Sequence, residues 1–261
     1  MVDALDVTDL VPAERREEIM RRASGERLVR VKDLAERLNV HEMTIRRDLD
    51  ALVDEGRLER VHGGARLKRQ AGLEVSYQTR SATNREVKAR IARAAANLID
   101  EGDTVAFDAS TTALEVQRQL RLTSGLAIVT SLDGANTLAE AGVPFMVIGG
   151  SFHAPARSFV GRGVCAQLAT LHPDKVFFSA KGFSLRAGFT DAHLPEAEAK
   201  ECLIASAGTK IALLDSDKFN QEALGTIARL DHVDILITER EPPEEVRERL
   251  DQYGVQLIVA D

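Results

Sequence analysis

The sequence predicts an α/β protein of two domains, a small winged helix-turn-helix followed by a larger domain with a mostly parallel sheet. Residues 12–67 contain three helix-like segments and then two short apolar runs around a glycine pair. After residue 100, short apolar strands alternate with helical stretches. Between these regions, residues 68–82 are polar and show no strong apolar period. We therefore expect a domain at 12–67, a linker at 68–82 and a second domain at 83–261.

Three helices are expected in the first domain, because apolar residues recur at helical spacing in three segments. These segments are 12–22, the stretch around Leu34, Ala35 and Leu38, and 41–55. A strand-like stretch, 28–31, lies between the first two. After the third helix, two apolar runs at 58–61 and 65–67 flank glycines, which is the signal of a β-hairpin, or wing.

The second domain is predicted to open with a long amphipathic helix over 84–100, closed by Gly102. Seven continuous apolar runs of strand length follow, separated mostly by helical stretches. They are 104–107, 126–130, 144–148, 175–179, 209–214, 233–237 and 255–259. Runs of this kind are typical of parallel strands that are covered by helices on both faces of a sheet.

Composition narrows the class of protein further. With 44% hydrophobic and 29% charged residues, the chain is neither disordered nor collagen-like. Its only cysteines, Cys165 and Cys202, are far apart in sequence, so we expect neither a disulfide framework nor a zinc ribbon. No apolar run approaches the roughly 20 residues of a membrane helix, and three aspartates near the start argue against a signal peptide. A reducing cytoplasm is the expected location, with no membrane partner.

The net charge of −7 is unevenly distributed. Residues 1–70 hold 15 Lys+Arg and 15 Asp+Glu, so all of the acidity lies after residue 70. From Arg57 to Arg69 there are five basic residues against Glu59 alone. Such a cluster can face phosphates, and the alternative is a solvated charged surface.

The third helix has the features of a DNA recognition helix. Arg can pair two donors with guanine and Thr can touch a thymine methyl in the major groove, while a wing approaches the backbone or minor groove. The candidate DNA-binding residues are His41, Glu42, Met43, Thr44, Arg46, Arg47, Arg60, His62, Gly63, Gly64 and Arg66. The alternative is a helical packing module whose arginines face water.

A second candidate site follows the strand at 104–107. Free backbone N–H groups at a helix N-terminus, completed by hydroxyls, form a cradle for an anion such as phosphate. The residues there are Asp108, Ser110, Thr111 and Thr112. The alternative is that Ser110 or Thr111 only caps the helix.

Further candidate residues follow later strands, and two of them lie on the helix before the strand at 209–214. Parallel sheets collect ligand groups at the carboxyl ends of their strands. These candidates are Ser131, Gly150, Lys181, Glu196, Lys200, Asp215 and Lys218. The lysines can bind phosphate, and Asp108 and Asp215 can accept hydrogen bonds from sugar hydroxyls. Each alone is equally compatible with a surface or capping role.

No cofactor and no metal is expected. The G-x-G-x-x-A match at 161–166 follows a poor strand, and Asp174 comes too early to be the ribose-binding acid. The six histidines show neither an i,i+4 pair nor cysteine partners at ligand spacing. Ser131, Cys165 and Cys202 lack a nucleophile setting, so catalytic residues are not assigned.

The chain closely resembles the DeoR-type bacterial transcription regulators. In the first domain the resemblance lies in Val31–Ala35, Thr44–Leu49 and Arg60–Ala65. In the second it lies in Asp108–Thr112, Gly149–Gly150, Gly188–Asp191, Glu196–Lys200 and Asp215–Phe219. His41, Ala109 and Lys181 depart from the family pattern, in which Ser, Ser and Asp are frequent. The resemblance implies a C-terminal domain similar in fold to ribose-5-phosphate isomerase and coenzyme A transferases, which senses a phosphorylated sugar or a related metabolite.

The resulting hypothesis is a DNA-binding repressor of a carbohydrate-metabolism operon. We expect double-stranded operator DNA and a phosphorylated sugar as partners, and a homo-oligomer, dimer or tetramer, that presents paired domains to DNA. One alternative is a sugar-phosphate isomerase or deaminase with an accessory DNA-binding domain. Another is an interaction module with a degenerate pocket. Binding without turnover is the favoured hypothesis.

Overall fold

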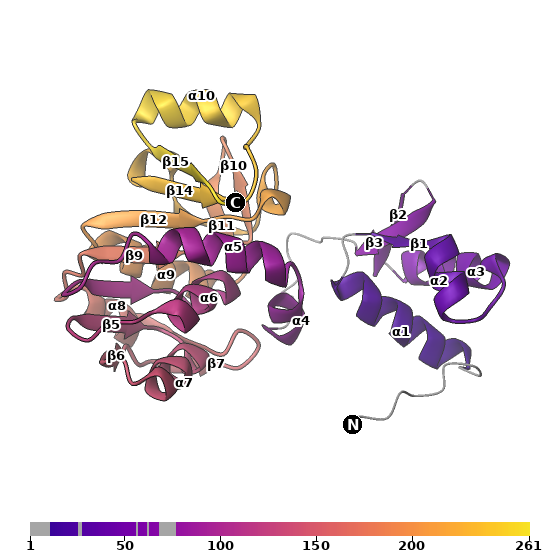
Figure 1. The fold of residues 1–261 in the computed structure, drawn as a ribbon, viewed down its shortest axis with the longest axis horizontal. Helices are drawn as coiled ribbons and strands as arrows, with labels where there is room; N and C mark the ends of the chain where they lie inside the picture. Colours follow the sequence, from indigo (N-terminus) through magenta and orange to yellow (C-terminus); the bar gives the residue numbers. More distant parts are fainter. Residues whose placement is uncertain (1–10, 26–27, 56, 62, 68–76) are drawn as a thin grey trace. The chain divides into compact units, whose positions relative to one another are not determined.

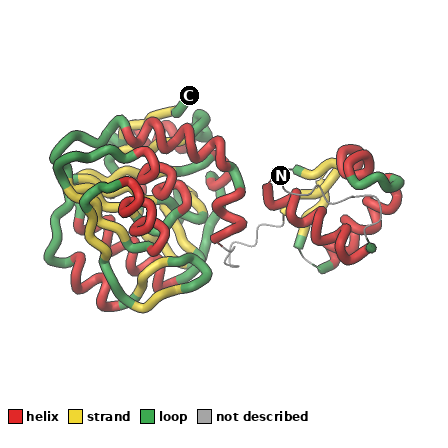
Figure 2. Tube along the Cα trace, turned by 60° about the horizontal axis from the view of Figure 1, so that its bottom comes forward, coloured by secondary structure: helices red, strands yellow, loops and turns green. Residues whose placement is uncertain are grey.

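The computed structural model describes residues 11–25, 28–55, 57–61, 63–67 and 77–261 (Figure 1). The chain divides into two compact units, residues 1–70 with 81–84, and residues 71–80 with 85–261. Figure 2 shows that the smaller unit is mainly helical and that the larger one combines helices with many strands. Each unit is described separately below.

The N-terminal unit is a winged helix-turn-helix, as predicted. Its helices are α1 (Pro12–Gly25), α2 (Val31–Arg37) and α3 (Glu42–Asp54), and its strands are β1 (Val29–Arg30), β2 (Leu58–Val61) and β3 (Gly64–Leu67). The strands form an antiparallel sheet in the order β1-β3-β2. One difference concerns Val31, which was expected to end a strand. It is buried and begins α2.

Apolar faces of the three helices meet in one core. Ile19 of α1, Leu34 of α2 and Leu49 of α3 are almost fully buried in it. Within this core Asp48 of α3 accepts a hydrogen bond of 2.5 Å from Nε of Arg15 in α1. Because both side chains are buried, this ion pair fixes α3 against α1 and leaves the opposite face of α3 exposed.

The C-terminal unit contains a seven-stranded sheet in the order β15-β14-β12-β9-β4-β5-β6, and all of its pairings are parallel. The seven predicted strands are thereby confirmed, with bounds that differ by up to two residues. They are β4 (Thr104–Phe107), β5 (Leu126–Val129), β6 (Phe145–Val147), β9 (Lys175–Phe178), β12 (Thr209–Leu213), β14 (Ile235–Thr238) and β15 (Gln256–Val259).

Helices cover both faces of this sheet. The core on one face includes residues of α5 (Arg85–Ala96), α6 (Thr111–Gln119) and α7 (Leu132–Ala141). The core on the other includes α8 (Arg162–Leu168), α9 (Leu194–Ser206) and α10 (Glu244–Tyr253). The unit also contains two short 3-10 helices, η2 (Ser216–Lys218) and η3 (Leu230–His232). None of the described helices has the length and apolar character needed to cross a membrane.

Five described strands were not predicted. β7 (Ser151–His153) and β8 (Ser158–Val160) form an antiparallel hairpin. β10 (Gly182–Ser184), β11 (Gly188–Asp191) and β13 (Gly225–Ala228) form a second small antiparallel sheet. In the segment expected to be a linker, residues 77–82 form helix α4 (Tyr77–Ala82), and residues 68–76 lie outside the described part.

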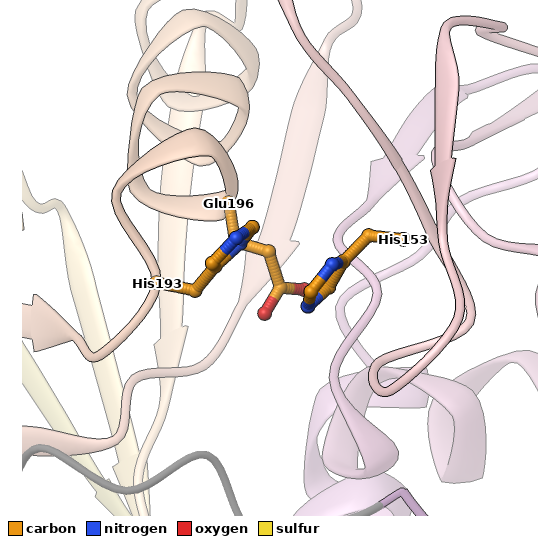
Figure 3. A group of neighbouring side chains, drawn as sticks. All are labelled: His153, His193 and Glu196. Atoms are coloured by element: carbon orange, nitrogen blue, oxygen red, sulfur yellow. The ribbon is translucent and has the colours of Figure 1, made fainter.

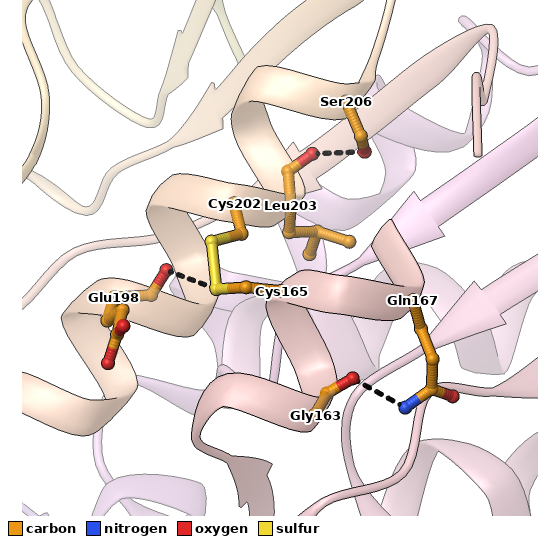
Figure 4. The surroundings of a disulfide bond; sticks show 7 residues. All are labelled: Gly163, Cys165, Gln167, Glu198, Cys202, Leu203 and Ser206. Carbon is orange, nitrogen blue, oxygen red and sulfur yellow. Dashed lines mark hydrogen bonds between the residues drawn. A yellow bond between two sulfur atoms is a disulfide. The ribbon is translucent and has the colours of Figure 1, made fainter. Parts of the chain in front are cut away.

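The expectation that Cys165 and Cys202 stay unpaired is wrong. They form a disulfide between α8 and α9, with Cα atoms 5.4 Å apart (Figure 4). Sequence separation gave no hint of this pairing, because α8 and α9 become neighbours only when both pack on the same face of the sheet. Sγ of Cys165 also lies 3.7 Å from the carbonyl oxygen of Glu198 in α9.

Candidate functional site

The N-terminal end of α3 presents polar side chains to solvent. Met43, Arg46 and Arg47 are exposed, while Glu42 and Thr44 are half-buried. His41 is the N-cap of α3, and its Nδ1 accepts a hydrogen bond of 3.2 Å from the backbone N–H of Met43. The imidazole thus serves as the capping acceptor that a serine hydroxyl commonly provides.

The arginines of α3 differ in how they are paired. Arg46 makes an exposed i,i+4 ion pair with Glu42 at 3.3 Å, whereas Arg47 has no ion-pair partner among the described residues. An exposed pair of this type contributes only a few tenths of a kcal/mol. Both guanidinium groups are therefore available to an anionic partner.

The basic cluster at 57–69 is less positive than its sequence suggests. Arg57 pairs with Glu17 and Glu55 at 3.1 and 3.4 Å. Arg60 pairs with Asp50 and donates to the backbone oxygen of Arg46. These contacts give Arg60 a structural role between β2 and α3 besides the predicted contact to DNA.

At the wing itself, Arg66 pairs with Glu59 across β2 and β3. Gly63 has a φ of +79°, and a Cβ on Gly64 would lie 2.1 Å from the backbone oxygen of Val29. Both glycines are therefore required by the fold of the hairpin. His62, Lys68 and Arg69 lie outside the described residues.

In the C-terminal unit, the predicted polar residues gather at the carboxyl ends of the central strands. The chain runs from β4 outward through β5 and β6, and then returns to β9 on the other side of β4. Asp108 follows β4 and Ser179 follows β9, so the two residues flank this switch in strand order. Open parallel sheets bind ligands at such points.

Lys200 of α9 is held inside this region by three oxygen atoms. Its Nζ lies 3.1 Å from Oδ2 of Asp108, 2.8 Å from Oδ2 of Asp191 and 2.9 Å from the backbone oxygen of Ser179. Burial by itself lowers the pKa of Lys200, but the two carboxylates outweigh it, so the pKa is raised. Lys200 is thus a fixed cation.

The two carboxylates that contact Lys200 also interact with other groups of the protein. Asp108 accepts hydrogen bonds from the backbone N–H groups of Ser110 and Ser179, at 3.0 and 3.1 Å. Burial opposes ionisation of Asp191, yet Lys200 and Lys181 hold its pKa at about 2. Asp108 was predicted to accept bonds from a sugar, but in this structure its oxygens already have protein partners.

Two other lysines lie in the same region. Nζ of Lys218 lies 3.1 Å from Oδ2 of Asp215 and donates to Oγ of Ser179 at 3.0 Å. Nζ of Lys181 is buried and has no hydrogen-bond partner among the described residues. Burial, reinforced by the charge of Arg80, lowers the pKa of Lys181 to about 8. Nζ of Lys181 thus makes no hydrogen bond to a carboxylate in the described part, although Asp191 and Glu196 interact with it electrostatically.

The predicted anion cradle at 108–112 contains one residue that caps α6 and one hydroxyl without a hydrogen-bond partner among the described residues. Ser110 is the N-cap of α6, and its Oγ accepts a hydrogen bond of 3.1 Å from the N–H of Ala113. Thr111 and Thr112 are the first two residues of α6. Oγ1 of Thr112 and Oδ1 of Asp215 are both buried and have no hydrogen-bond partner among the described residues. Ser110 therefore caps the helix, whereas the neighbouring hydroxyl of Thr112 makes no hydrogen bond in the described part.

Three predicted residues have structural contacts of their own. Oγ of Ser131 caps α7 by accepting a hydrogen bond of 3.1 Å from Gly134. A Cβ on Gly150 would lie 2.5 Å from the backbone oxygen of Val160, so glycine is needed there. Glu196 accepts a hydrogen bond of 3.0 Å from Oγ of Ser158.

Sequence reasoning gave no role in the site to two buried polar residues. Asp191 contacts Lys200, and Lys88 of α5 is buried. Burial, together with the charge of Lys218, lowers the pKa of Lys88 to about 7. A signal was present in the sequence, because Lys88 lies on the same helical stripe as Ile91, Ala92 and Ala95.

The sequence shows no pair of histidines at metal-ligand spacing, yet the fold brings two of them together. His153 and His193 lie together with Glu196, with one ligand atom of each within 4.8 Å of the others (Figure 3). The sequence spacing concealed this cluster, because β7 and the start of α9 are 40 residues apart at His153 and His193.

A winged helix-turn-helix with exposed arginines, joined to an α/β domain whose ligand edge is rich in lysine, defines a ligand-responsive DNA-binding regulator. Residues 15–71 match the DeoR-like helix-turn-helix domain, and residues 83–240 match the DeoR C terminal sensor domain. The chain belongs to the DeoR family of transcriptional regulators.

Two curated relatives resemble the chain over most of its length. The "HTH-type transcriptional repressor GlcR" of Bacillus subtilis is 34% identical over 86% of this chain and 87% of its own. The "Putative aga operon transcriptional repressor" of Escherichia coli O157:H7 is 32% identical over 95% and 93%. Among solved structures, ribose 5-phosphate isomerase A of Methanocaldococcus jannaschii has 16% identity and a TM-score of 0.41, covering 53% of this chain and 56% of that one.

Proposed function

We propose that this regulator represses a carbohydrate-metabolism operon and that a phosphorylated sugar, bound in the C-terminal unit, controls its binding to operator DNA. The proposal that the ligand is phosphorylated rests on one observation. At the switch in strand order, Lys181 follows β9, and its buried Nζ has no hydrogen-bond partner among the described residues. Helix α6 follows β4, and the buried hydroxyl of Thr112 at its N-terminus has none there either. A phosphate would be neutralised by the lysine and would accept hydrogen bonds from the N–H groups and the hydroxyl.

The two curated relatives support the repressor role, since both are named repressors. The contacts of Asp108 favour binding over turnover. A general base must reach the proton that it removes, whereas both oxygens of Asp108 accept backbone hydrogen bonds and Oδ2 also contacts Lys200. We further propose that the protein acts in the cytoplasm as a homo-oligomer, so that two N-terminal units meet one operator.

The arginines of α3 provide the first test. We expect Arg46→Ala and Arg47→Ala each to weaken operator binding by about 1–3 kcal/mol if their guanidinium groups contact base edges. Arg46 loses only an exposed ion pair with Glu42, so the fold should stay intact. Binding is measured by titrating an operator fragment at one fixed salt concentration, because phosphate contacts make DNA affinity depend on salt.

The matched control is Arg247→Ala, which removes an exposed arginine from α10 in the other unit. It should leave operator affinity unchanged. Wild-type affinity in both α3 variants would contradict the assignment of α3 as the recognition helix.

Control by ligand is tested at Thr112. Thr112→Val removes the unpartnered hydroxyl with little change of volume, and should weaken the effect of a sugar phosphate on operator binding. DNA binding without ligand should survive, because α3 lies in the other unit. The measurement titrates a panel of sugar phosphates into operator-bound protein. Thr209→Val, at the amino end of β12, is the control at the opposite edge of the sheet. Identical ligand midpoints for wild type and Thr112→Val would exclude this hydroxyl as a donor.

The affinity for a sugar phosphate should also depend on pH through Lys181. Its pKa is lowered to about 8 in the free protein, mainly by burial, and a bound anion stabilises the charged form and raises this pKa. The protein should therefore take up protons on binding around pH 8, and the affinity should fall as pH rises through 8. Calorimetry in two buffers of different ionisation enthalpy counts these protons, and Lys181→Met should abolish the uptake. Equal uptake in wild type and variant would assign it to another group.

A further inference from the structure

Two histidines and a glutamate converge in the C-terminal unit, from segments far apart in the sequence (Figure 3). His153 is the last residue of β7, whereas His193 precedes α9 and Glu196 lies in its first turn. The imidazole rings are stacked, with centroids 3.9 Å apart and planes inclined by 10°. Both histidines are half-buried, so the cluster can be reached from solvent.

Glu196 and His193 each carry one buried polar atom without a hydrogen-bond partner in the described part. Glu196 is only 4% exposed, and its Oε1 accepts the hydrogen bond from Ser158. Its Oε2 and Nδ1 of His193 are buried without a hydrogen-bond partner among the described residues. A buried polar group without a partner destabilises the fold, and a charged oxygen does so most. A bound cation would satisfy both atoms at once.

The neighbouring ammonium groups do not fill this role. Lys181 and Lys200 interact electrostatically with Glu196. However, Nζ of Lys200 is bonded to Asp191 and to the backbone of Ser179, and no bond from Lys181 to Glu196 is present in the described part. The free carboxylate oxygen therefore faces the imidazoles with nothing bonded to it.

We propose that His153, His193 and Glu196 form a site for a divalent transition metal of the zinc class. Two imidazole nitrogens and one carboxylate oxygen are a zinc donor set that leaves a fourth position open. Bonds of 2.0–2.2 Å place tetrahedral ligand atoms roughly 3.4 Å apart. The ligand atoms lie within 4.8 Å of one another, so each pair must approach by at most roughly 1.4 Å to reach this spacing. Ser158 would orient the carboxylate from behind, as outer hydrogen-bond partners of metal ligands do.

The choice of metal follows from the donors. Imidazole suits zinc, copper, nickel and iron, whereas magnesium and calcium take oxygen ligands. The ion would tie the hairpin of β7 and β8 to the first turn of α9, the helix that also carries Lys200. The site shares Glu196 with the predicted sugar-phosphate site, but neither histidine belongs to the predicted ligand-binding residues, so the histidine variants test the metal site separately.

The test is isothermal titration of the full chain with Zn²⁺ and, separately, Mg²⁺, after chelator treatment and dialysis. We expect one Zn²⁺ per chain and no binding of Mg²⁺. His153→Ala and His193→Ala should each weaken the Zn²⁺ affinity at least tenfold, and Zn²⁺ should raise the melting temperature of wild type but not of these variants. His172→Ala removes an exposed histidine outside the cluster and should bind like wild type.

Circular dichroism of the metal-free variants checks their folding, and His153→Gln and His193→Gln replace any alanine variant that fails to fold. Absence of Zn²⁺ binding would overturn the proposal. So would wild-type affinity in both histidine variants, or an equal loss in His172→Ala. A failed response to sugar phosphate leaves these readouts unaffected, so the two proposals can fail separately.

Discussion

Lys200→Met should lower the free energy of unfolding of the C-terminal unit by about 3–5 kcal/mol, because it leaves two buried carboxylates without their cation. Asp108 and Asp191 both lie within 3.1 Å of Nζ of Lys200, and all three side chains are almost fully buried. Methionine preserves most of the volume, so the loss reports charge rather than a cavity. Urea unfolding followed by circular dichroism measures it.

In the wild type, the stabilisation by Lys200 and Asp191 should be constant between about pH 5 and pH 9. The pKa of Lys200 is raised, so its contribution is fully present below the unfolded pKa and is lost only as pH rises through the folded pKa. The pKa of Asp191 is lowered to about 2, so its contribution is present above the unfolded pKa and is lost as pH falls toward 2. The pH values at which these two contributions are lost both lie outside the range from about pH 5 to pH 9.

Two variants make this prediction specific. Lys210→Met removes a lysine of β12 that has no carboxylate partner among the described residues, and it should change stability by less than about 0.5 kcal/mol. Asp191→Asn combined with Lys200→Met should cost less than the sum of the two single changes, since each single change leaves the other charge unpaired. A strictly additive double variant would mean that the pair is not coupled.

The central sheet could be predicted from the sequence because its strands are buried on both faces. The run at 126–130, for example, becomes β5, whose last three residues are buried. A strand of this kind is a continuous apolar run whatever its neighbours are. β7 and β10 gave no such signal. They are three residues long, contain Ser, His or Gly, and are strands only because β8 and β11 pair with them.

The candidate site could be predicted only in part, for a related reason. The carboxyl ends of β4, β9 and β12 were located from the strands, so Asp108, Lys181 and Asp215 were found. Asp191 was not, because it is the last residue of the unpredicted β11 and contacts Lys200 of α9. As a result, Lys200 was assigned to phosphate, whereas it is bound to carboxylates.

Reduction of the disulfide between Cys165 and Cys202 is expected to have the second large effect on stability. Reduction should lower the free energy of unfolding by about 2–4 kcal/mol, because the bond closes a loop with a sequence separation of 37 and so restricts the unfolded chain. For a unit of this size, that corresponds to a fall in melting temperature of roughly 4–16 °C. The measurement is a thermal melt with and without dithiothreitol, and free thiols are counted in the unfolded protein before each melt.

The double variant Cys165→Ser/Cys202→Ser is the control for this experiment. It should melt near the temperature of the reduced wild type and should not respond to dithiothreitol. The effect should reach the ligand edge as well, since the bond holds α9 to α8 and α9 carries Lys200. Disulfide bonds are rare in reducing compartments, so the thiol count matters. Two free thiols in protein purified without reductant, together with an unchanged melting temperature, would show that the cysteines do not pair in solution and that the contact between α8 and α9 holds through packing alone.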